Sequence, residues 1–172
     1  MIEVEKSFDP SAEQLARILD GAEFLGEVVN HDVYYDYPDF RLAKKKIKLR
    51  VRNGVPELKI EKSETVDDEI EDEEEIRQFF NTQTPLDEFI KKELIEIINY
   101  KNTRRKYTKE GINIDVDSLD FGMQSCDFEV MVTGQDEIKK AEEKIFNFAH
   151  EHGLDTTLQN IGKRRTSLKK FK

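Results

Sequence analysis

The sequence predicts an antiparallel α+β domain with around eight strands. Segments with a two-residue hydrophobic period are joined by tight turns such as Asn53-Gly54 and Glu110-Gly111, which favour hairpins over parallel βαβ units. The helical segments are grouped between and after the strands instead of alternating with them. A chain of this length is expected to fold as one domain over residues 1–172.

The first part of the chain is expected to form a strand, a helix and four more strands. Residues 2–8 alternate apolar and polar side chains, which is typical of a strand. In SAEQLARILD, residues 11–20, we expect a helix with Asp9 as its cap, Pro10 at its first position and Gly21 at its end. The four further strands are expected over residues 23–29, 32–37, 44–52 and 56–64.

The second part is expected to contain short helices, three strands and a long helix. The acidic stretch over residues 65–75 begins as a strand, and helical apolar spacing follows in EEEIRQFFN and LDEFIKKEL. Strands are expected over residues 97–109, 112–118 and 126–132. Residues 134–153 give the clearest helical pattern, with apolar side chains at Ile138, Ala141, Ile145 and Phe148. The basic tail, residues 162–172, is compatible with a helix.

Composition excludes several classes of protein. The net charge of -9 argues against a nucleic acid held by overall positive charge. The single Cys126 excludes an internal disulfide framework, and with His31, His150 and His152 it draws no Cys/His zinc pattern, so a metal would need oxygen ligands. No apolar run approaches the roughly 20 residues that span a bilayer. We expect a cytoplasmic protein.

Ionic side chains gather on one face of several strands and are sorted there by sign. Because alternate residues of a strand share a face, residues 46–52 are apolar on one side and cationic on the other. The cationic face carries Lys46, Lys48, Arg50 and Arg52. Carboxylate pairs at the same spacing are Glu3 and Glu5, Asp115 and Asp117, and Asp127 and Glu129. Arg105 shares a face with Lys101, Thr103 and Tyr107.

Two arrangements place ionic side chains on one face of a strand, and the sorting by sign argues against the first, because a water-facing sheet would more often mix signs within each strand. An open antiparallel sheet would turn its ionic face to water and its apolar face to a core. A closed barrel would turn the ionic faces inward and leave the apolar faces outside, to be covered by helices. The barrel would suit a polyphosphate with divalent cations, because Lys and Arg bind phosphate oxygens while carboxylates hold Mg²⁺ or Mn²⁺.

Several short motifs, taken in order, resemble one protein family. EVEKSF resembles an ExExK strand, DVYYDYPDF resembles the segment after the first helix, and KLRVRNGVPELK resembles an Arg-x-Arg hairpin with a downstream lysine. NIDVDSLDFG and DFEVMV resemble late acidic strands. From Ile2 to about Phe171 the chain resembles the CYTH superfamily of triphosphate tunnel metalloenzymes, and within it the thiamine triphosphatases.

The resemblance implies an eight-stranded antiparallel barrel, the triphosphate tunnel, with a charged interior and helices packed outside. It implies removal of the terminal phosphate of a triphosphate with Mg²⁺ or Mn²⁺. The implied metal ligands are Glu3, Glu5, Asp127 and Glu129, assisted by Asp115. The implied triphosphate-binding residues are Lys48, Arg50, Arg52, Lys59, Arg105 and, in the basic tail, Lys163. Among these residues, Glu5, Arg52 and Lys59 are the implied catalytic residues, and a further acidic residue falls at Glu71 or Glu69.

The sequence departs from the family pattern in ways that affect the substrate. Ser7 stands where the family lysine is expected, and alternation points Lys6 to the opposite face. Asp127 is shorter than the usual glutamate. Lys48 aligns with a tryptophan of animal thiamine triphosphatases, so inorganic tripolyphosphate ranks at least level with thiamine triphosphate, although Tyr34 or Tyr35 offers an aromatic surface.

Two other functions remain open at this point. The first is a class IV adenylate cyclase on the same scaffold, and the second is a polyphosphate-binding module without catalysis. For the favoured triphosphatase we expect a monomer whose partner is a small-molecule triphosphate, with no nucleic acid and no membrane.

Overall fold

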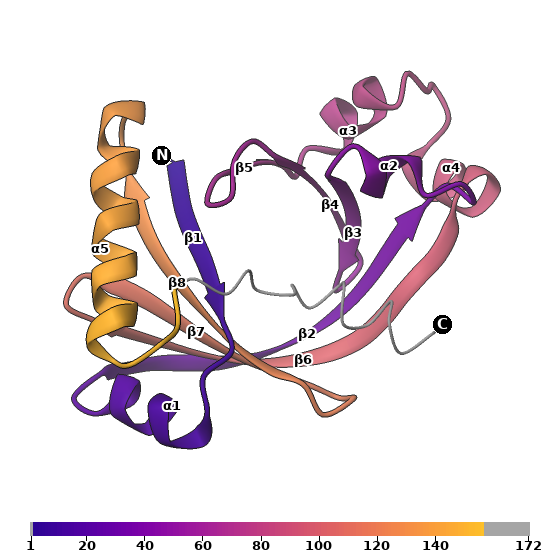
Figure 1. The fold of residues 1–172 in the computed structure, drawn as a ribbon. Coiled ribbons are helices and arrows are strands. Elements are labelled where there is room, and N and C mark those ends of the chain that lie inside the picture. The colour runs from indigo at the N-terminus through magenta and orange to yellow at the C-terminus, as the bar shows by residue number, and fades with distance from the viewer. Residues whose placement is uncertain (1, 157–172) are drawn as a thin grey trace.

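The computed structural model describes residues 2–156. Eight antiparallel strands form a nearly closed barrel with helices on its outside, which confirms the predicted α+β barrel (Figure 1). The strands are β1 (Ile2–Phe8), β2 (Glu23–Asp36), β3 (Ile47–Arg52), β4 (Val55–Glu61), β5 (Asp67–Ile70), β6 (Ile95–Lys109), β7 (Ile112–Leu119) and β8 (Gln124–Val132). The helices are α1 (Ala12–Leu19), α2 (Arg41–Lys44), α3 (Glu73–Phe79), α4 (Leu86–Glu93), the 3₁₀ helix η1 (Gln135–Glu137) and α5 (Ile138–Glu151).

The sheet follows the order β1-β8-β7-β6-β2-β3-β4-β5, so β1 and β5 are its two ends. The backbone N–H of Glu5 in β1 donates to the carbonyl of Thr65, just before β5, at 2.9 Å. Lys6 Nζ lies 3.7 Å from Glu64, and the Thr65 hydroxyl donates to Glu142 of α5. We call this junction of β1 with the turn before β5 the seam. Its contacts draw the ends of the sheet together.

Two of the hairpin turns predicted from sequence have the backbone geometry that their residues favour. Asn53 and Gly54 both have positive φ, 52° and 86°, and they join β3 to β4. Glu110 and Gly111, with φ of 54° and 70°, join β6 to β7 in the same way. Left-handed conformations at both central residues match the twist of a two-residue hairpin, and glycine accepts them without strain.

Three local expectations differ from the structure. Ser11, and not Asp9, caps α1, because Ser11 and Gln14 exchange hydrogen bonds in a capping box. The two strands expected over residues 23–37 are one long strand, β2, whose pairing with β6 shifts between Phe24 and Gly26. The short helix α2 was not expected at all.

Two predictions from the sequence concern residues outside the range 2–156. The helix considered for residues 162–172 falls there, and so does the end of the expected single domain over residues 1–172, which stays a prediction. Within residues 2–156, no helix is long and apolar enough to cross a lipid bilayer.

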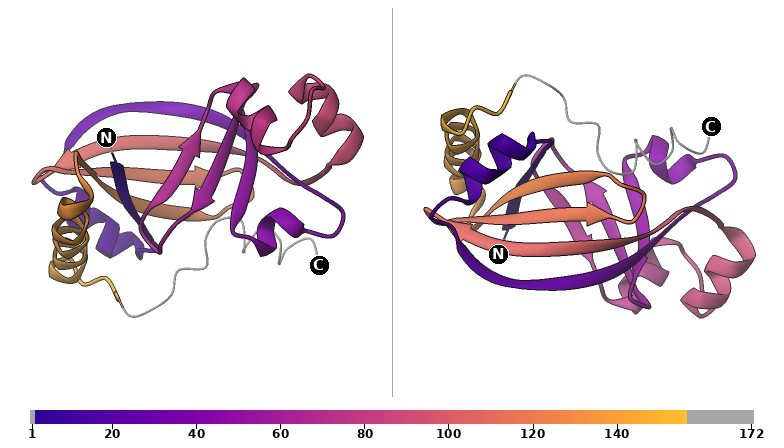
Figure 2. Two further views of the ribbon diagram at one scale, coloured as in Figure 1. Left: turned by 90° about the horizontal axis from the view of Figure 1, so that it is seen from above. Right: turned by 90° about the horizontal axis from the view of Figure 1, so that it is seen from below.

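The main hydrophobic core lies outside the barrel, between the sheet and the helices. Helices α1 and α5 pack on the outer faces of β1, β7 and β8, where Ile18, Phe128 and Ile145 are completely buried. Helices α2, α3 and α4 pack on β3 and β4 around Leu49 and Leu58. The two views of Figure 2 show these groups of helices on opposite sides of the barrel. The apolar faces of β1, β3, β4, β7 and β8 are therefore covered, and their ionic faces turn inward.

One part of the interior is apolar, which the sequence analysis did not anticipate. Ile98 and Tyr100 alternate along β6 with Asn102 on the inward face, and they pack with Leu119 of β7. The phenol of Tyr34 in β2 joins this cluster, with its ring centroid 6.1 Å from that of Tyr100. The ionic residues thus fill only part of the space that the strands enclose.

Removing the side chain of Ile145 tests the packing of α5. Ile145→Ala is expected to lower the free energy of unfolding by about 2–5 kcal/mol, because it leaves a cavity in the outer core. Val29→Ala is the control, since Val29 is 58% exposed and should change stability by no more than about 0.5 kcal/mol. Urea unfolding measures both. Equal stability of the two variants would contradict the assigned packing of α5.

Candidate active site

The register of the strands places like charges directly opposite each other on two sides of the interior. On the acidic wall, formed by β1, β7 and β8, Glu5 lies directly opposite Glu129, and Asp127 directly opposite Asp115. On the cationic wall, formed by β3 and β4, Lys48 lies directly opposite Lys59. Like charges directly opposite each other destabilise a sheet. Both walls are therefore arranged to bind ligands of the opposite charge.

Three carboxylates of the acidic wall lie close enough together to hold one metal ion. One ligand oxygen from each of Glu3, Glu5 and Glu129 lies within 4.8 Å of the other two, and we call these residues the glutamate triad. Burial, followed by repulsion from neighbouring carboxylates, raises the pKa of Glu129 to about 8 and also raises the pKa of Glu3. Carboxylate oxygens are preferred ligands of Mg²⁺ and Mn²⁺. The triad therefore fits such an ion, whose charge would relieve the repulsion.

The two aspartates predicted to bind metal have a different neighbour. The Arg104 guanidinium lies 2.6 Å from Asp115 and 3.3 Å from Asp127, and it makes a two-point contact with Asp117 at 2.7 and 2.9 Å. Burial and the charge of Glu5 raise the pKa of Asp127 to about 7, against the opposing effects of Arg104 and a hydrogen bond with Ser7. Asp115 and Asp127 thus adjoin the triad but are paired with an arginine.

Carboxylates pair with the two arginines of the cationic wall. Arg52 makes a two-point contact with Asp32, at 2.7 and 2.9 Å, and Asp32 is fully buried. Arg50 is paired with Glu57 and lies 3.6 Å from Glu69. Such two-point pairs fix the plane of a guanidinium group.

Lys59 belongs to the cationic wall and is attracted by carboxylates of the acidic wall. Burial lowers the pKa of Lys59, but the attraction of Glu5, Glu69 and Asp67 outweighs burial, so the pKa is raised overall. The Lys59 ammonium lies 3.7 Å from Asp67 and 3.9 Å from Glu69. This lysine therefore stays charged at neutral pH beside the glutamate triad.

Lys48 differs from the other cations of this wall. Among the residues that the structure describes, Lys48 makes no ion pair. It lines a small cavity of about 10 Å³ together with Tyr34, Arg50, Glu57 and Lys59. An ammonium group beside a second lysine, with no carboxylate partner of its own, is suited to bind an anion.

Comparison with known families agrees with this geometry. The model of the CYTH domain matches residues 1–159. The chain belongs to the CYTH family. No curated protein matches the chain.

Solved structures share the CYTH fold over almost the whole chain. The PH1819 protein of Pyrococcus horikoshii OT3 is 26% identical, with a TM-score of 0.67, and the match covers 89% of this chain and 91% of that one. The PH1012 protein of the same organism is 20% identical, with a TM-score of 0.70 and coverage of 96% and 99%. HpAC1 from Hippeastrum, named as an adenylyl cyclase with a dominant triphosphatase activity, is 20% identical, with a TM-score of 0.58 and coverage of 96% and 95%.

The register places Arg104, and not Arg105, in the interior of this CYTH domain. Across the Glu110-Gly111 turn, Lys109 pairs with Ile112, and counting back from there pairs Arg104 with Asp117 and Arg105 with Val116. Val116 is fully buried in the outer core, so Arg105 lies on the outer face of β6. The expectation that Arg105 binds phosphate is therefore corrected. Counting residues from this turn in the sequence would have identified Arg104.

The remaining sequence-predicted residues also separate by face. Ser7 is on the inward face, where it forms a hydrogen bond with Asp127, and Lys6 is on the outward face, as expected.

Of the two acidic alternatives, Glu69 lies opposite Lys59, whereas Glu71 follows the end of β5 and is exposed. Tyr35 lies opposite the outer-core residue Leu49, so Tyr34 is the aromatic residue of the interior. Lys163 lies outside the described residues.

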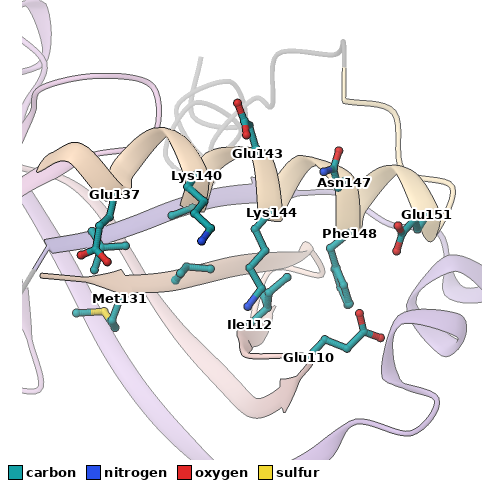
Figure 3. A pocket seen from close by; sticks show the side chains of 13 residues that line it. Glu110, Ile112, Met131, Glu137, Lys140, Glu143, Lys144, Asn147, Phe148 and Glu151 are labelled. Carbon is teal, nitrogen blue, oxygen red and sulfur yellow. The ribbon is translucent and has the colours of Figure 1, made fainter. Parts of the chain in front are cut away.

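One large cavity within residues 2–156 lies outside the barrel. It has a volume of about 550 Å³ and lies between α5 and the outer side of β7 and β8, as Figure 3 shows. Ile112 and Phe148 line it, and Lys140 and Lys144 reach over it from α5. Of the site residues predicted from sequence, none that lies within residues 2–156 lines this cavity. The charged interior of the barrel remains the candidate active site.

The raised pKa of Glu129 predicts how stability depends on pH when metal is absent. Its ordinary pKa is 4.5, and its folded value is about 8, so the folded state holds the proton more tightly. Wild-type stability should therefore fall as pH rises from about 4.5 to 8. Glu129→Gln removes this ionisation and should be more stable than wild type at pH 8, on the order of a few kcal/mol.

Urea unfolding in EDTA at pH 5, 6, 7 and 8 measures this difference. Glu27→Gln, which changes an exposed glutamate, is the control and should follow the wild type. A constant difference between Glu129→Gln and wild type over this range would contradict the raised pKa.

Proposed function

We propose that this CYTH domain is a metal-dependent hydrolase that removes the terminal phosphate of a triphosphate. The observation that carries the proposal is the set of like-charged pairs, Glu5 with Glu129 and Lys48 with Lys59, on facing walls of one barrel. A polyanion together with a divalent cation would compensate both repulsions at once. Neither partner alone would do so.

In this proposal each wall performs a separate task. The glutamate triad would hold Mg²⁺ or Mn²⁺, which supplies Lewis-acid polarisation of the phosphorus and activation of water. Arg50, Arg52, Lys48 and Lys59 bind the phosphate oxygens and orient the chain of phosphates along β3 and β4. The carboxylates that fix the two arginine side chains keep these donors in place before the substrate binds.

The comparisons support a reaction on a triphosphate without defining it. HpAC1 is described as an adenylyl cyclase with a dominant triphosphatase activity, and a solved protein from Vibrio parahaemolyticus is named as an adenylate cyclase. A class IV cyclase is therefore the alternative for this chain. The products distinguish the two activities, because a cyclase releases cyclic AMP and pyrophosphate from ATP, whereas a triphosphatase releases phosphate.

For the substrate we propose inorganic tripolyphosphate or thiamine triphosphate, bound by a monomer without nucleic acid or membrane. Lys48 favours the inorganic substrate because it adds a cation to the wall. Tyr34, packed beside Tyr100, offers a ring surface that would suit an organic group. A thiamine triphosphatase subtype stays part of this proposal.

Phosphate release tests the function directly. Tripolyphosphate, thiamine triphosphate and ATP are each incubated with the protein and Mg²⁺ or Mn²⁺, and free phosphate is measured. Glu5→Gln is expected to lower kcat/KM at least about 100-fold, because a proposed metal ligand is lost. Glu27→Gln is the matched control and should retain full activity. Binding of tripolyphosphate without release of phosphate would favour the non-catalytic binding module instead.

The serine at position 7 tests which face of β1 meets the substrate. Ser7→Lys adds a cation to the inward face and is expected to lower the Kd for tripolyphosphate about 2- to 10-fold. Lys6→Ser, on the outward face of the same strand, is the control and should leave the Kd unchanged. Calorimetry on the metal-loaded protein measures both. An effect of Lys6→Ser as large as that of Ser7→Lys would contradict the assigned faces.

A further inference from the structure

Arg104 lies at the centre of three carboxylates. Its Nη1, Nε and Nη2 atoms lie 2.6, 2.7 and 3.3 Å from the nearest oxygens of Asp115, Asp117 and Asp127. The side chains of these aspartates are only 5%, 0% and 3% exposed, and that of Arg104 is 15% exposed. We call these three residues the aspartate group. Carboxylate oxygens are ligands that divalent ions prefer in proteins. In this chain the Arg104 side chain supplies the positive charge at this position.

The aspartate group adjoins the glutamate triad without merging with it. Asp127 lies two residues before Glu129 on β8, and Asp127 pairs with Ser7 while Glu129 pairs with Glu5. Within residues 2–156, the triad is the one group whose ligand oxygens converge for a metal ion. Ser7 carries no charge, so the cation that contacts Asp127 comes from β6. The acidic wall thus holds two sets of carboxylates, and one set already contains a cation.

We propose that Arg104 is a built-in second cation of this site, so that the chain binds a single divalent ion at the glutamate triad. The inference rests on the proposed function, and adds to it the number of ions and a role for Arg104. Arg104 acts as a positioning residue. It fixes Asp115 and Asp127 beside the triad, and it prevents the aspartate group from taking a second ion.

Counting bound Mn²⁺ tests this inference without measuring activity. Metal-stripped protein is titrated in the absence of substrate by calorimetry and by electron paramagnetic resonance. The wild type is expected to bind one equivalent. Arg104→Gln is expected to bind two, because Asp115, Asp117 and Asp127 lose their cation. Arg104→Lys keeps a positive charge and should return to one equivalent.

Two further variants make the test decisive. Lys106→Gln is the matched control, since Lys106 is an exposed cation two residues along the same face of β6, and it should leave one equivalent. Glu129→Gln is expected to weaken the wild-type Mn²⁺ site by about 10- to 100-fold. This variant keeps Arg104, so it gives an answer even if Arg104→Gln does not fold.

Several outcomes would overturn the inference. These are two equivalents in the wild type, one equivalent in folded Arg104→Gln, or an unchanged Mn²⁺ Kd in Glu129→Gln. Failure of the proposed function is seen separately, because it is the absence of phosphate release. A protein that binds one equivalent but releases no phosphate would reject the hydrolase and leave the role of Arg104 in place.

Discussion

The structure depends on placing charges of the same sign next to each other inside a barrel. A buried charge is tolerated only when it is paired, and a like-charged neighbour increases its cost. Here Arg104 offsets three aspartates, and Asp32 offsets Arg52. These internal pairs allow the two walls to exist in the absence of ligand. Among the described residues Lys48 makes no ion pair, and the ligand oxygens of the glutamate triad converge in the same interior.

The position of the hydrophobic core follows from this interior. Strands whose ionic faces turn inward must bury their apolar faces on the outside, and the helices provide that cover. Core and candidate active site therefore occupy opposite faces of the same strands. A single strand such as β8 contributes Phe128 to the outer core and Glu129 to the interior. Residues of the core and residues of the candidate site are therefore neighbours in the sequence and do not belong to separate domains.

Local signals account for what could be predicted from the sequence. The Asn53-Gly54 and Glu110-Gly111 turns and the two-residue alternation are properties of short segments, and they predicted the hairpins and the gathering of ionic side chains on one face of the strands. That this face turns inward was implied by the resemblance to the CYTH superfamily. The roles proposed for the site residues stay predictions, although the positions of those within residues 2–156 are now described. Arg105 was selected in error because its face was assigned within one strand, without counting from the adjoining turn.

Long-range contacts could not be predicted in this way. Closing the barrel involves Thr65 and Glu142, which are 77 residues apart in the chain, and no periodicity within a strand encodes such a contact. The apolar part of the interior is similar, because Tyr34, Tyr100 and Leu119 meet only when three strands are in register. The pairing of Arg52 with Asp32 likewise depends on the register of β2 with β3.

Glu5 belongs to two structures at once. Its carboxylate is part of the glutamate triad, while its backbone N–H closes the seam through Thr65. A ligand that immobilises the carboxylate also restrains the amide. Binding of a ligand in the tunnel would therefore raise the free energy of opening the seam. Slowed hydrogen exchange at the Glu5 amide would then report that a ligand is bound, without any measurement of product.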